Sequence, residues 1–286
     1  MARGLTRILM PMPVDVLAEV LANSRLSDDY SVVALAAPAI ARQARPGQFV
    51  MVKPAAGFDP LLRRPFSVFE ILHDPDGTPR GITLLNKRVG VGTGLLYAAR
   101  PGDHLACLGP LGTPFDVVGP PARAWLVAGG VGLAPFATLA AALAARGTET
   151  TLFYGARRAA DLHGIEIFEP LGVRTIVATE DGSRGDRGLI TGPLARELDG
   201  LDARTEARIY ACGPTAMMRA VASLAAGRDL RCDVSLEQTM GCGMGGCYSC
   251  VVRVRGEDGQ PHFVRSCLAG PVFDARAIVW DELAGH

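Results

Sequence analysis

The stretch AWLVAGGVGLAPF at residues 124–136 joins an apolar run to three closely spaced glycines. The apolar run is typical of a buried parallel strand, and the Ala- and Leu-rich residues that follow predict a helix ending at Gly147. Further strand-like runs begin the segments 148–158, 173–182 and 207–227, the last of which continues into a second helical pattern. Strands that alternate with helices indicate a parallel α/β sheet, an architecture that commonly binds nucleotides.

The residues on either side of this α/β pattern are organised differently. Upstream, short β-rich runs alternate with Pro-Gly and Asp-Gly turn signals, which favours a small antiparallel β-barrel. Downstream of Gly227, a cysteine-rich loop precedes a hairpin pattern with Asp258-Gly259 at its turn. The sequence therefore predicts a multi-domain β plus α/β fold. Its expected domains are an antiparallel barrel at residues 15–119, a parallel-sheet domain at 120–227 and a small C-terminal domain at 228–286.

Composition and charge exclude several classes of protein. Apolar residues make up 49% of the 286 residues and charged residues 20%, as expected of a folded globular chain. Lys plus Arg and Asp plus Glu both number 29, so the formal net charge of zero gives no support to a nucleic-acid or membrane partner. No apolar run reaches membrane-spanning length, and residues 1–16 lack the pattern of a secretory leader. We therefore expect a cytoplasmic protein.

Four of the seven cysteines are concentrated near the C-terminus, with the spacing Cys242-x4-Cys247-x2-Cys250-x16-Cys267. This spacing matches the C-x4-C-x2-C…C arrangement of thiolates that hold a 2Fe-2S cluster. Glycines crowd the loop, which lets it turn tightly and bring its N–H groups to the sulfur atoms. A zinc site with four cysteine ligands is the main alternative, although such sites commonly use two C-x2-C pairs and only one occurs here. Unliganded thiols are a further alternative.

Two short motifs in the predicted barrel have the chemistry of a flavin or phosphate site. In RRPFS, Arg64 can pair with a pyrophosphate, Pro65 stiffens the chain and Ser67 offers a hydroxyl group. Further on, GVGTG at residues 90–94 precedes a helical pattern, so N–H groups at the helix start could receive phosphate. For Arg64 alone, a surface arginine before an edge strand is an equal alternative. The order of both motifs within one barrel strengthens the flavin interpretation.

Two motifs in the α/β region indicate a pyridine dinucleotide. Gly129, Gly130 and Gly132 lie between a strand and a helix, where a dinucleotide pyrophosphate can approach the backbone, although they do not form G-x-G-x-x-G. The CGP sequence that begins at Cys212 follows the fourth strand, at the sheet edge where ligands bind. A buried strand-end thiol is the alternative for Cys212.

The choice between NAD and NADP is open on these motifs alone. Arg157 and Arg158 follow the second strand of the α/β region, where arginines can neutralise the 2′-phosphate of NADP. A solvated helix start is the other explanation of the two arginines. The sequence therefore raises the question of specificity at this position without answering it.

In their order along the chain, RRPFS, GVGT, AGGVGLAP, ACGP and the cysteine motif with its GPVF tail resemble one family. It is the family of electron-transfer subunits of the NAD-dependent, two-subunit dihydroorotate dehydrogenases, within the ferredoxin-reductase superfamily. The resemblance extends from about Leu17 to Trp280. It implies FAD bound by Arg64, Pro65, Phe66, Ser67, Leu85, Asn86, Lys87, Gly92 and Thr93. It implies cluster ligation by Cys242, Cys247, Cys250 and Cys267. For NAD, it implies a site over Gly129, Gly130, Gly132 and Pro135, with Gly213 and the catalytic residue Cys212 near the nicotinamide.

The resemblance also implies a division of labour between two kinds of subunit. An FMN-containing dihydroorotate dehydrogenase catalytic subunit would oxidise dihydroorotate, and electrons would pass through the 2Fe-2S cluster and FAD to NAD+, in the biosynthesis of UMP. The complex would be a heterotetramer with two chains of each kind. The five histidines are scattered and form no pattern with carboxylates that suggests a general base, which fits C–H cleavage on the partner.

Two other functions are compatible with the residues. Related flavin and iron–sulfur subunits occur in hydrogenases, sulfide dehydrogenases and bifurcating transhydrogenase complexes, which would keep the cofactors and change the partner. A function of another class would make the C-terminal unit a zinc-stabilised binding module on a barrel that has lost its cofactors.

Overall fold

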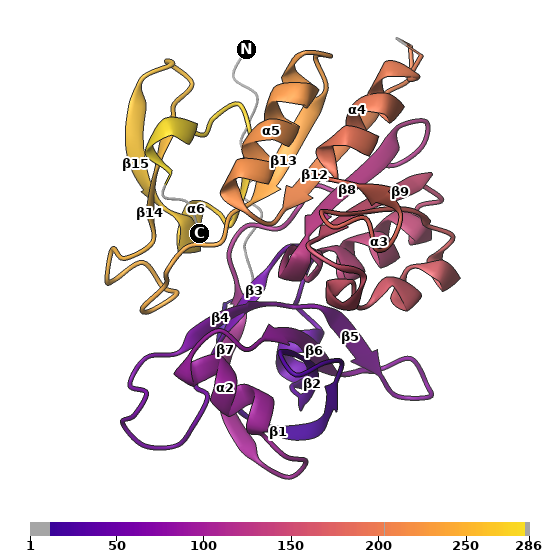
Figure 1. Ribbon diagram of the computed structural model, residues 1–286. Coiled ribbons are helices and arrows are strands. Elements are labelled where there is room, and N and C mark those ends of the chain that lie inside the picture. The colour runs from indigo at the N-terminus through magenta and orange to yellow at the C-terminus, as the bar shows by residue number, and fades with distance from the viewer. Residues whose placement is uncertain (1–11, 203, 284–286) are drawn as a thin grey trace.

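The computed structural model describes residues 12–202 and 204–283, so the expectation about a leader falls largely outside the described residues. An antiparallel barrel lies at one end of the molecule, a parallel sheet with helices at the other, and a hairpin unit beside the sheet (Figure 1). The predicted multi-domain β plus α/β fold class is confirmed. Within the described part of the chain, no helix is both long and apolar enough to cross a membrane.

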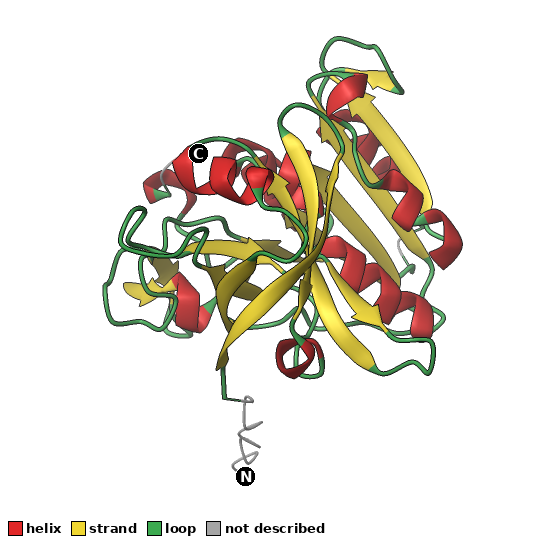
Figure 2. Cartoon of the chain, turned by 90° about the horizontal axis from the view of Figure 1, so that it is seen from below, coloured by secondary structure: helices red, strands yellow, loops and turns green. Residues whose placement is uncertain are grey.

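Seven antiparallel strands form the barrel, in the order β4-β3-β7-β1-β2-β6-β5. Their inward side chains, among them Val33, Leu35, Ile82 and Leu84, fill the interior and are fully buried. Figure 2 views the molecule from the barrel end and shows the strands curving around this interior. The elements are β1 (Val14–Arg25), β2 (Tyr30–Ala36), α1 (Pro38–Ala41), β3 (Phe49–Val52), β4 (Arg64–Ser67), β5 (Glu70–His73), β6 (Pro79–Lys87), α2 (Val91–Ala98) and β7 (His104–Leu111).

The second sheet has the order β11-β10-β9-β8-β12-β13-β16, and all its neighbours are parallel except β13 and β16. The first strand, β8, is the apolar run of residues 123–129, and a short 3-10 turn (η1) leads from it into α3, as the glycine motif predicts. The elements are β8 (Arg123–Gly129), η1 (Gly130–Leu133), α3 (Phe136–Ala145), β9 (Thr150–Ala156), η2 (Ala159–Asp161), η3 (Ile165–Ile167), η4 (Glu169–Leu171), β10 (Arg174–Thr179), β11 (Asp186–Arg187), α4 (Thr191–Asp199), β12 (Ala207–Cys212), α5 (Thr215–Ala226) and β13 (Arg231–Ser235).

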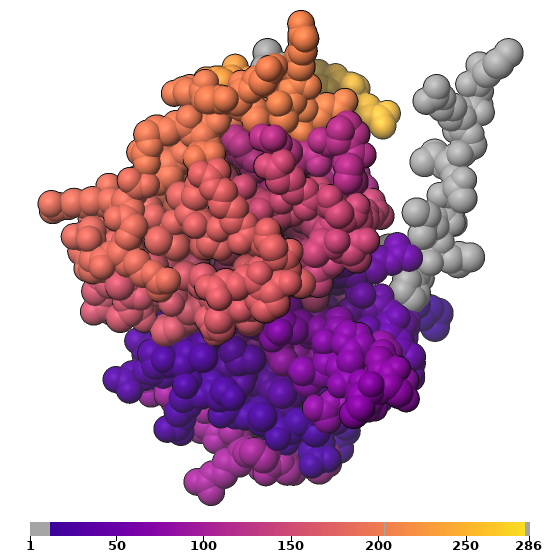
Figure 3. Space-filling model, turned by 90° about the vertical axis from the view of Figure 1, so that its right-hand side faces the viewer, coloured from indigo at the N-terminus to yellow at the C-terminus, as the bar shows by residue number. Residues whose placement is uncertain are grey.

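The two faces of the parallel sheet bury different partners. One face packs with α3 and with barrel side chains such as Tyr30, Phe69 and Phe115, so barrel and sheet share one hydrophobic core. Figure 3 shows the two parts in broad contact on one side of the molecule. The other face packs with α4, α5 and the C-terminal hairpin residues Val252 and Val254. The relative position of the barrel and the sheet is therefore fixed by buried apolar surface.

The C-terminal segment leaves the parallel sheet and returns to it. Its elements are β14 (Val251–Arg255), β15 (Pro261–Arg265), α6 (Ser266–Ala269), β16 (Val272–Asp274) and η5 (Trp280–Glu282). The hairpin turns at Gly256–Gln260, as predicted, and β16 pairs antiparallel with β13. Because β13 begins after residue 227 and pairs with β12, the parallel sheet extends past the domain boundary expected there. The exact domain boundaries stay a prediction.

A buried ion pair joins the linker between barrel and sheet to the sheet itself. Arg208 of β12 donates from Nε to Asp233 of β13 at 2.8 Å and also pairs with Asp116, which lies between β7 and β8. The side chain of Arg208 is 8% exposed and that of Asp233 only 4%. Burial raises the pKa of the Asp233 carboxyl group, and the charge of Arg208 partly offsets this effect. The buried Asp233 carboxylate therefore needs the positive charge of Arg208 to offset the cost of removing it from water.

The turns that follow β8 and β12 pack backbone against backbone. A Cβ atom on Gly132 would lie 2.3 Å from the carbonyl oxygen of Cys212, and one on Gly213 would lie 2.9 Å from the nitrogen of Gly129. Gly213 also has φ +146°, a conformation that L side chains rarely adopt. The glycines at these positions are therefore required by packing, whatever ligand the turns bind.

We expect replacement of Arg208 by Met to lower the free energy of unfolding by about 3–5 kcal/mol. It leaves the buried Asp233 carboxylate with only the longer contact to the exposed Arg231, at 3.5 Å. The measurement is the midpoint of urea unfolding. The matched control is R123M, which removes an arginine of the neighbouring strand that pairs with Glu149 at the surface. It should cost about 0–1 kcal/mol. Equal losses in the two variants would contradict the assigned role of Arg208.

We expect Gly132→Ala to lower the free energy of unfolding by about 1–3 kcal/mol, because the added methyl group must displace the Cys212 backbone. Thermal unfolding followed by circular dichroism measures this. The control is Gly94→Ala in α2, where the nearest atom, Cγ of Arg88, would lie 4.0 Å away. Helix propensity should make that variant neutral or slightly more stable. A destabilised G94A with an unaffected G132A would refute the packing argument.

Candidate functional site

A cleft of about 350 Å³ lies where the barrel, the parallel sheet and the C-terminal segment meet. Its barrel wall comes from β4, β6 and the start of α2, and its sheet wall from the turn after β8 and the last residue of β12. The segment that leads from β13 toward the cysteines closes the third side. Parallel sheets bind ligands outside the carboxyl ends of their strands, and the cleft lies at these ends.

Six of the nine residues predicted to bind FAD line this cleft: Pro65, Phe66, Ser67, Leu85, Lys87 and Thr93. The other three support its wall. Arg64 lies against the start of α2, since a Cβ atom on Gly92 would be 3.1 Å from its Nε atom. Asn86 donates from Nδ2 to the carbonyl oxygen of Thr93 at 3.1 Å, while its buried Oδ1 atom has no hydrogen-bond partner.

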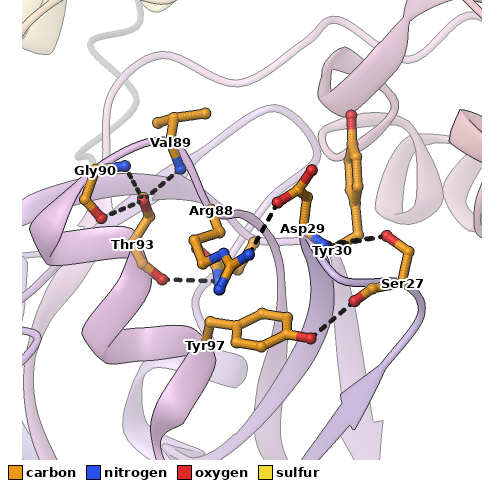
Figure 4. Close-up of polar contacts among 9 residues, drawn as sticks. Ser27, Asp29, Tyr30, Arg88, Val89, Gly90, Thr93 and Tyr97 are labelled. Atoms are coloured by element: carbon orange, nitrogen blue, oxygen red, sulfur yellow. Dashed lines mark hydrogen bonds and ion pairs between the residues drawn. The ribbon is translucent and has the colours of Figure 1, made fainter.

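The hydroxyl group of Thr93 fixes the start of α2 (Figure 4). It accepts hydrogen bonds from the N–H groups of Val89 and Gly90 at 2.9 and 3.0 Å, and it lies 3.1 Å from the carbonyl oxygen of Gly90. Two contacts with the turn before β2 hold the helix: Arg88 pairs with Asp29 at 3.3 Å, and Tyr97 donates to the carbonyl oxygen of Ser27 at 2.8 Å. The N-terminal N–H groups of α2, which helices leave without internal partners, are thereby set beside the cleft.

On the sheet wall, Cys212 lines the cleft together with Val131 and Ala134. Burial raises the pKa of the Cys212 thiol well above its usual value, and the nearby charge of Glu237 adds to this effect. Cys212 is therefore a neutral thiol near neutral pH, which excludes a role as a thiolate nucleophile. The predicted dinucleotide residues Gly129, Gly130, Gly132, Pro135 and Gly213 lie in the adjoining turns and do not line the cleft itself.

The third wall of the cleft was missed by sequence reasoning. It consists of the residues directly before the first clustered cysteine, namely Ser235, Leu236, Glu237, Gln238, Thr239 and Met240, with Pro271 and Phe49 beside them. One signal could have found this wall. A chain that leaves the carboxyl end of a parallel strand must cross the sheet edge where ligands bind, and β13 ends at Ser235.

The clustered cysteines differ in exposure. Cys250 and Cys267 are 1% exposed and pack in an apolar cluster with barrel side chains such as Met51 and Leu111. Cys242 is half-buried and Cys247 is exposed. The thiols of Cys250 and Cys267, the inner pair, therefore face the barrel, and those of Cys242 and Cys247, the outer pair, lie toward the surface of the loop.

Backbone and hydroxyl donors surround the outer pair. The N–H groups of Met244 and Gly246 donate to the sulfur of Cys242 at 3.4 and 3.2 Å. Hydrogen bonds from Ser249, and then from Cys242, lower the pKa of the Cys247 thiol to about 6. Such donors stabilise a thiolate, which is the form of cysteine that binds metal.

In the inner pair, burial and then the neighbouring Cys250 raise the pKa of Cys267 to about 12. Cys242 thus acts on the thiol of Cys247, and both Cys250 and Cys242 act on that of Cys267, so the four thiols influence one another. Among the described residues, no three Cys, His, Asp or Glu side chains are grouped around one ion position. Four cysteines with the C-x4-C-x2-C…C spacing, and backbone N–H groups that donate to the sulfur of Cys242, fit the predicted cluster.

The cleft and the inner cysteines share side chains. Phe49 and Met240 line the cleft and also belong to the apolar cluster that contains Cys250 and Cys267. Two backbone hydrogen bonds fix this junction: the Leu236 N–H donates to Pro271 at 2.9 Å, and the Thr113 N–H donates to Gly270 at 2.6 Å. The cleft and the two inner thiols therefore border the same two side chains, Phe49 and Met240.

Comparison with known families matches two parts of the chain. Residues 126–223 match the oxidoreductase NAD-binding domain, and residues 237–279 match the iron–sulfur cluster binding domain of dihydroorotate dehydrogenase B. The first match contains the glycine turns, and the second contains all four clustered cysteines. The chain is thus an oxidoreductase component with an NAD-binding and an iron–sulfur binding domain.

Among solved structures, the chain is similar to one described as "Insights into flavin-based electron bifurcation via the NADH-dependent reduced ferredoxin-NADP oxidoreductase structure". The two share 29% identity with a TM-score of 0.80, over 94% of this chain and 91% of that one. A ferredoxin reductase in carbazole 1,9a-dioxygenase is 27% identical with a TM-score of 0.63, over 76% of this chain and 67% of that one. The predicted ferredoxin-reductase type of fold is confirmed.

Curated relatives extend the match to nearly the full length. The electron transfer subunit of dihydroorotate dehydrogenase B (NAD(+)) from Desulforamulus reducens is 37% identical over 92% of this chain and 98% of that protein. The subunit of the same name from Bacillus caldolyticus is 41% identical over 82% of this chain and 87% of that protein. With the cleft, the glycine turns and the clustered cysteines in place, the chain belongs to the family of electron transfer subunits of dihydroorotate dehydrogenase B.

Proposed function

We propose that this chain carries electrons from an FMN-containing dihydroorotate dehydrogenase catalytic subunit to NAD+, in pyrimidine biosynthesis. The single observation that carries the proposal is the junction of cleft and cysteines through Phe49 and Met240. Carriers bound at these two places would lie close together, with apolar side chains between them that exclude water. The names of the curated relatives describe an electron transfer subunit that uses NAD(+), which supports the proposed transfer of electrons to NAD+.

The barrel wall is the proposed FAD site. When bound, FAD accepts electrons singly from an iron–sulfur cluster and delivers a hydride to NAD+, which joins the two kinds of electron transfer. Pro65, Phe66 and Ser67 present an edge of β4 to the cleft, and Leu85 and Lys87 present β6. Arg64, Asn86, Gly92 and Thr93 hold this wall to the start of α2, whose N–H groups suit a pyrophosphate.

The sheet wall is the proposed dinucleotide site. The turns at Gly129–Pro135 and at Gly213 lie at the carboxyl ends of β8 and β12, with no side chain on their glycines to hinder an approaching pyrophosphate. Cys212 lies between these turns and the barrel wall. As a neutral and buried thiol, it can contact a nicotinamide without adding a charge, and we assign it to positioning the hydride-accepting ring.

Cys242, Cys247, Cys250 and Cys267 are the proposed cluster ligands, and the surface above them is the proposed docking site of the catalytic subunit. Apolar side chains are exposed around the cysteine loop, notably Met244, Tyr248, Val251, Phe263 and Leu268. Most of them line a shallow hollow of about 420 Å³. Exposed apolar patches of this kind mark protein interfaces. We further infer a heterotetramer with two chains of each kind, in the cytoplasm, where the clustered thiols stay reduced.

The proposal is tested by mixing the purified chain with an FMN-containing dihydroorotate dehydrogenase subunit and measuring NAD+ reduction with dihydroorotate as the donor. The mixture should be active and the isolated chain inactive, because the proposal assigns C–H cleavage to the FMN-containing subunit. If the isolated chain oxidises dihydroorotate as fast as the mixture, the division of labour is wrong. If the chain reduces NAD+ only when it is mixed with a hydrogenase or sulfide dehydrogenase subunit, its partner is that subunit and not a dihydroorotate dehydrogenase.

We expect Cys267→Ser to reduce bound iron from about two atoms per chain to less than half of that value. The buried hydroxyl group is a poor substitute for a thiolate ligand, whereas the FAD content should stay unchanged because Cys267 does not line the cleft. Iron analysis and the visible spectrum measure both. The control is Cys232→Ala, which removes a buried thiol on β13 outside the cluster. Full iron content in C267S would remove this residue from the ligand set.

We expect Phe263→Asp to weaken binding of the catalytic subunit at least about tenfold, because a charge would replace an apolar contact at the proposed interface. Phe263 is 68% exposed, so the change should leave folding intact. Titration calorimetry with the purified subunit measures the Kd. The control is Leu189→Asp, an equally exposed apolar residue between β11 and α4. An unchanged Kd in F263D, or an equal loss in both variants, would place the interface elsewhere.

A further inference from the structure

Tyr30, the first residue of β2, brings a hydroxyl group from the barrel to the parallel sheet. Its side chain belongs to the core that the two parts share and is 4% exposed. Figure 4 shows the ring extending away from Ser27, which lies in the turn before β2. Buried tyrosine hydroxyl groups usually have a hydrogen-bond partner, but no group in the described part of the chain forms a hydrogen bond with this one. The oxygen atom is not fully enclosed, so a ligand can reach it.

This hydroxyl group faces the glycine turn after β8. Its oxygen atom lies 3.7 Å from the point where a Cβ atom on Gly130 would stand. Apart from the turn itself, nothing else in the described chain is within 4 Å of that point. Gly130 has φ +55°, a conformation that favours glycine, so the position stays without a side chain. An open space therefore lies between the backbone of the sheet turn and a hydroxyl group of the barrel.

Two neighbours hold the Tyr30 ring in this place. The imidazole of His163 packs against it with ring centroids 4.8 Å apart, and the backbone N–H of His163 donates to the Tyr154 hydroxyl group at 3.4 Å. The ammonium group of Lys87, a residue that lines the cleft, lies 5.5 Å from the Tyr30 ring centroid. The direction of the Tyr30 hydroxyl group is thus set before a ligand arrives, which lowers the entropic cost of binding.

The groups around the open space suit an anion. The Tyr30 hydroxyl group can donate one hydrogen bond, and Lys87 adds positive charge on the side of the cleft. A hydrogen bond from a hydroxyl group to a phosphate oxygen is charge-assisted, and it is stronger than one between neutral groups. In a dinucleotide, the pyrophosphate is the part that approaches a glycine turn closely and carries negative charge. A diphosphate is therefore the ligand group that this space fits.

We propose that the Tyr30 hydroxyl group donates a hydrogen bond to the pyrophosphate of the nicotinamide dinucleotide, so that barrel and sheet hold this ligand together. The inference rests on the proposed function, because it takes the turn at residues 129–132 as the dinucleotide site. It adds a binding residue from the barrel that belongs to neither the flavin motifs nor the glycine turns. FAD also contains a pyrophosphate, and the experiment separates these two sources of the same chemistry.

The test is titration calorimetry of the oxidised, cofactor-loaded chain with NAD+ and with ADP-ribose, which keeps the pyrophosphate and lacks the nicotinamide. The variant is Tyr30→Phe, which keeps the ring and its contacts with His163 and Lys87. Loss of a hydrogen bond to a charged group should raise the Kd for both ligands about tenfold or more. Bound FAD and the midpoint of thermal unfolding without ligand should stay at the wild-type values, because Y30F breaks no hydrogen bond within the described chain.

The matched control is Tyr210→Phe, which removes another tyrosine hydroxyl group from the same buried core. This hydroxyl group has a partner within the protein, since it donates to the carbonyl oxygen of Asp116 at 2.8 Å. Y210F should therefore lower the midpoint of thermal unfolding by about 2–4 °C and leave both Kd values within about twofold of the wild type. The two variants thus separate an effect on binding from an effect on folding.

The inference is overturned if Y30F binds both ligands as tightly as the wild type, or if Y210F weakens binding as much as Y30F. A loss confined to NAD+ would place the hydroxyl group at the nicotinamide end, and a loss of FAD from Y30F would assign it to the flavin. Either result contradicts the proposal. A wild-type chain that binds neither ligand would refute the proposed dinucleotide site itself, and the inference would fall with it.

Discussion

The return of the chain to the parallel sheet at β16 is the constraint on which the rest of the site depends. The segment that holds the cysteines leaves the sheet at Ser235 and is fixed to it again at Val272, directly opposite in the β13–β16 register. Both ends of the excursion are thus tied to one sheet edge. Within this excursion, Met240, Cys250 and Cys267 pack against the barrel, which places two thiols among barrel side chains. Cleft and thiols are neighbours because of this closure.

The chemistry of the site follows from how unevenly its groups are exposed to water. Cys212 is buried and uncharged beside the cleft, whereas the outer thiols receive hydrogen bonds near the surface. Phe49 and Met240 border both the cleft and the cluster that contains the inner thiols Cys250 and Cys267. The residues of the site are suited to binding, orienting and insulating electron carriers.

Patterns within short segments predicted more of the molecule than contacts between distant ones. The glycine turn after β8, the hairpin at Asp258-Gly259 and the close grouping of Cys242, Cys247 and Cys250 follow from local spacing, which depends on chain geometry alone. The wall formed by residues 235–240 was missed, because its place depends on β16, a strand too short to stand out in the sequence. The helix-capping role of Thr93 was also not foreseen, since one hydroxyl group can serve either a ligand or the backbone.

The edges of the parallel sheet have a consequence for assembly. At one edge β11 is two residues long and both are charged; at the other, β16 is three residues long and includes Asp274. Short, charged edge strands discourage the addition of a foreign strand by backbone pairing. Other chains therefore have little opportunity to extend this sheet, and association has to proceed through side-chain surfaces.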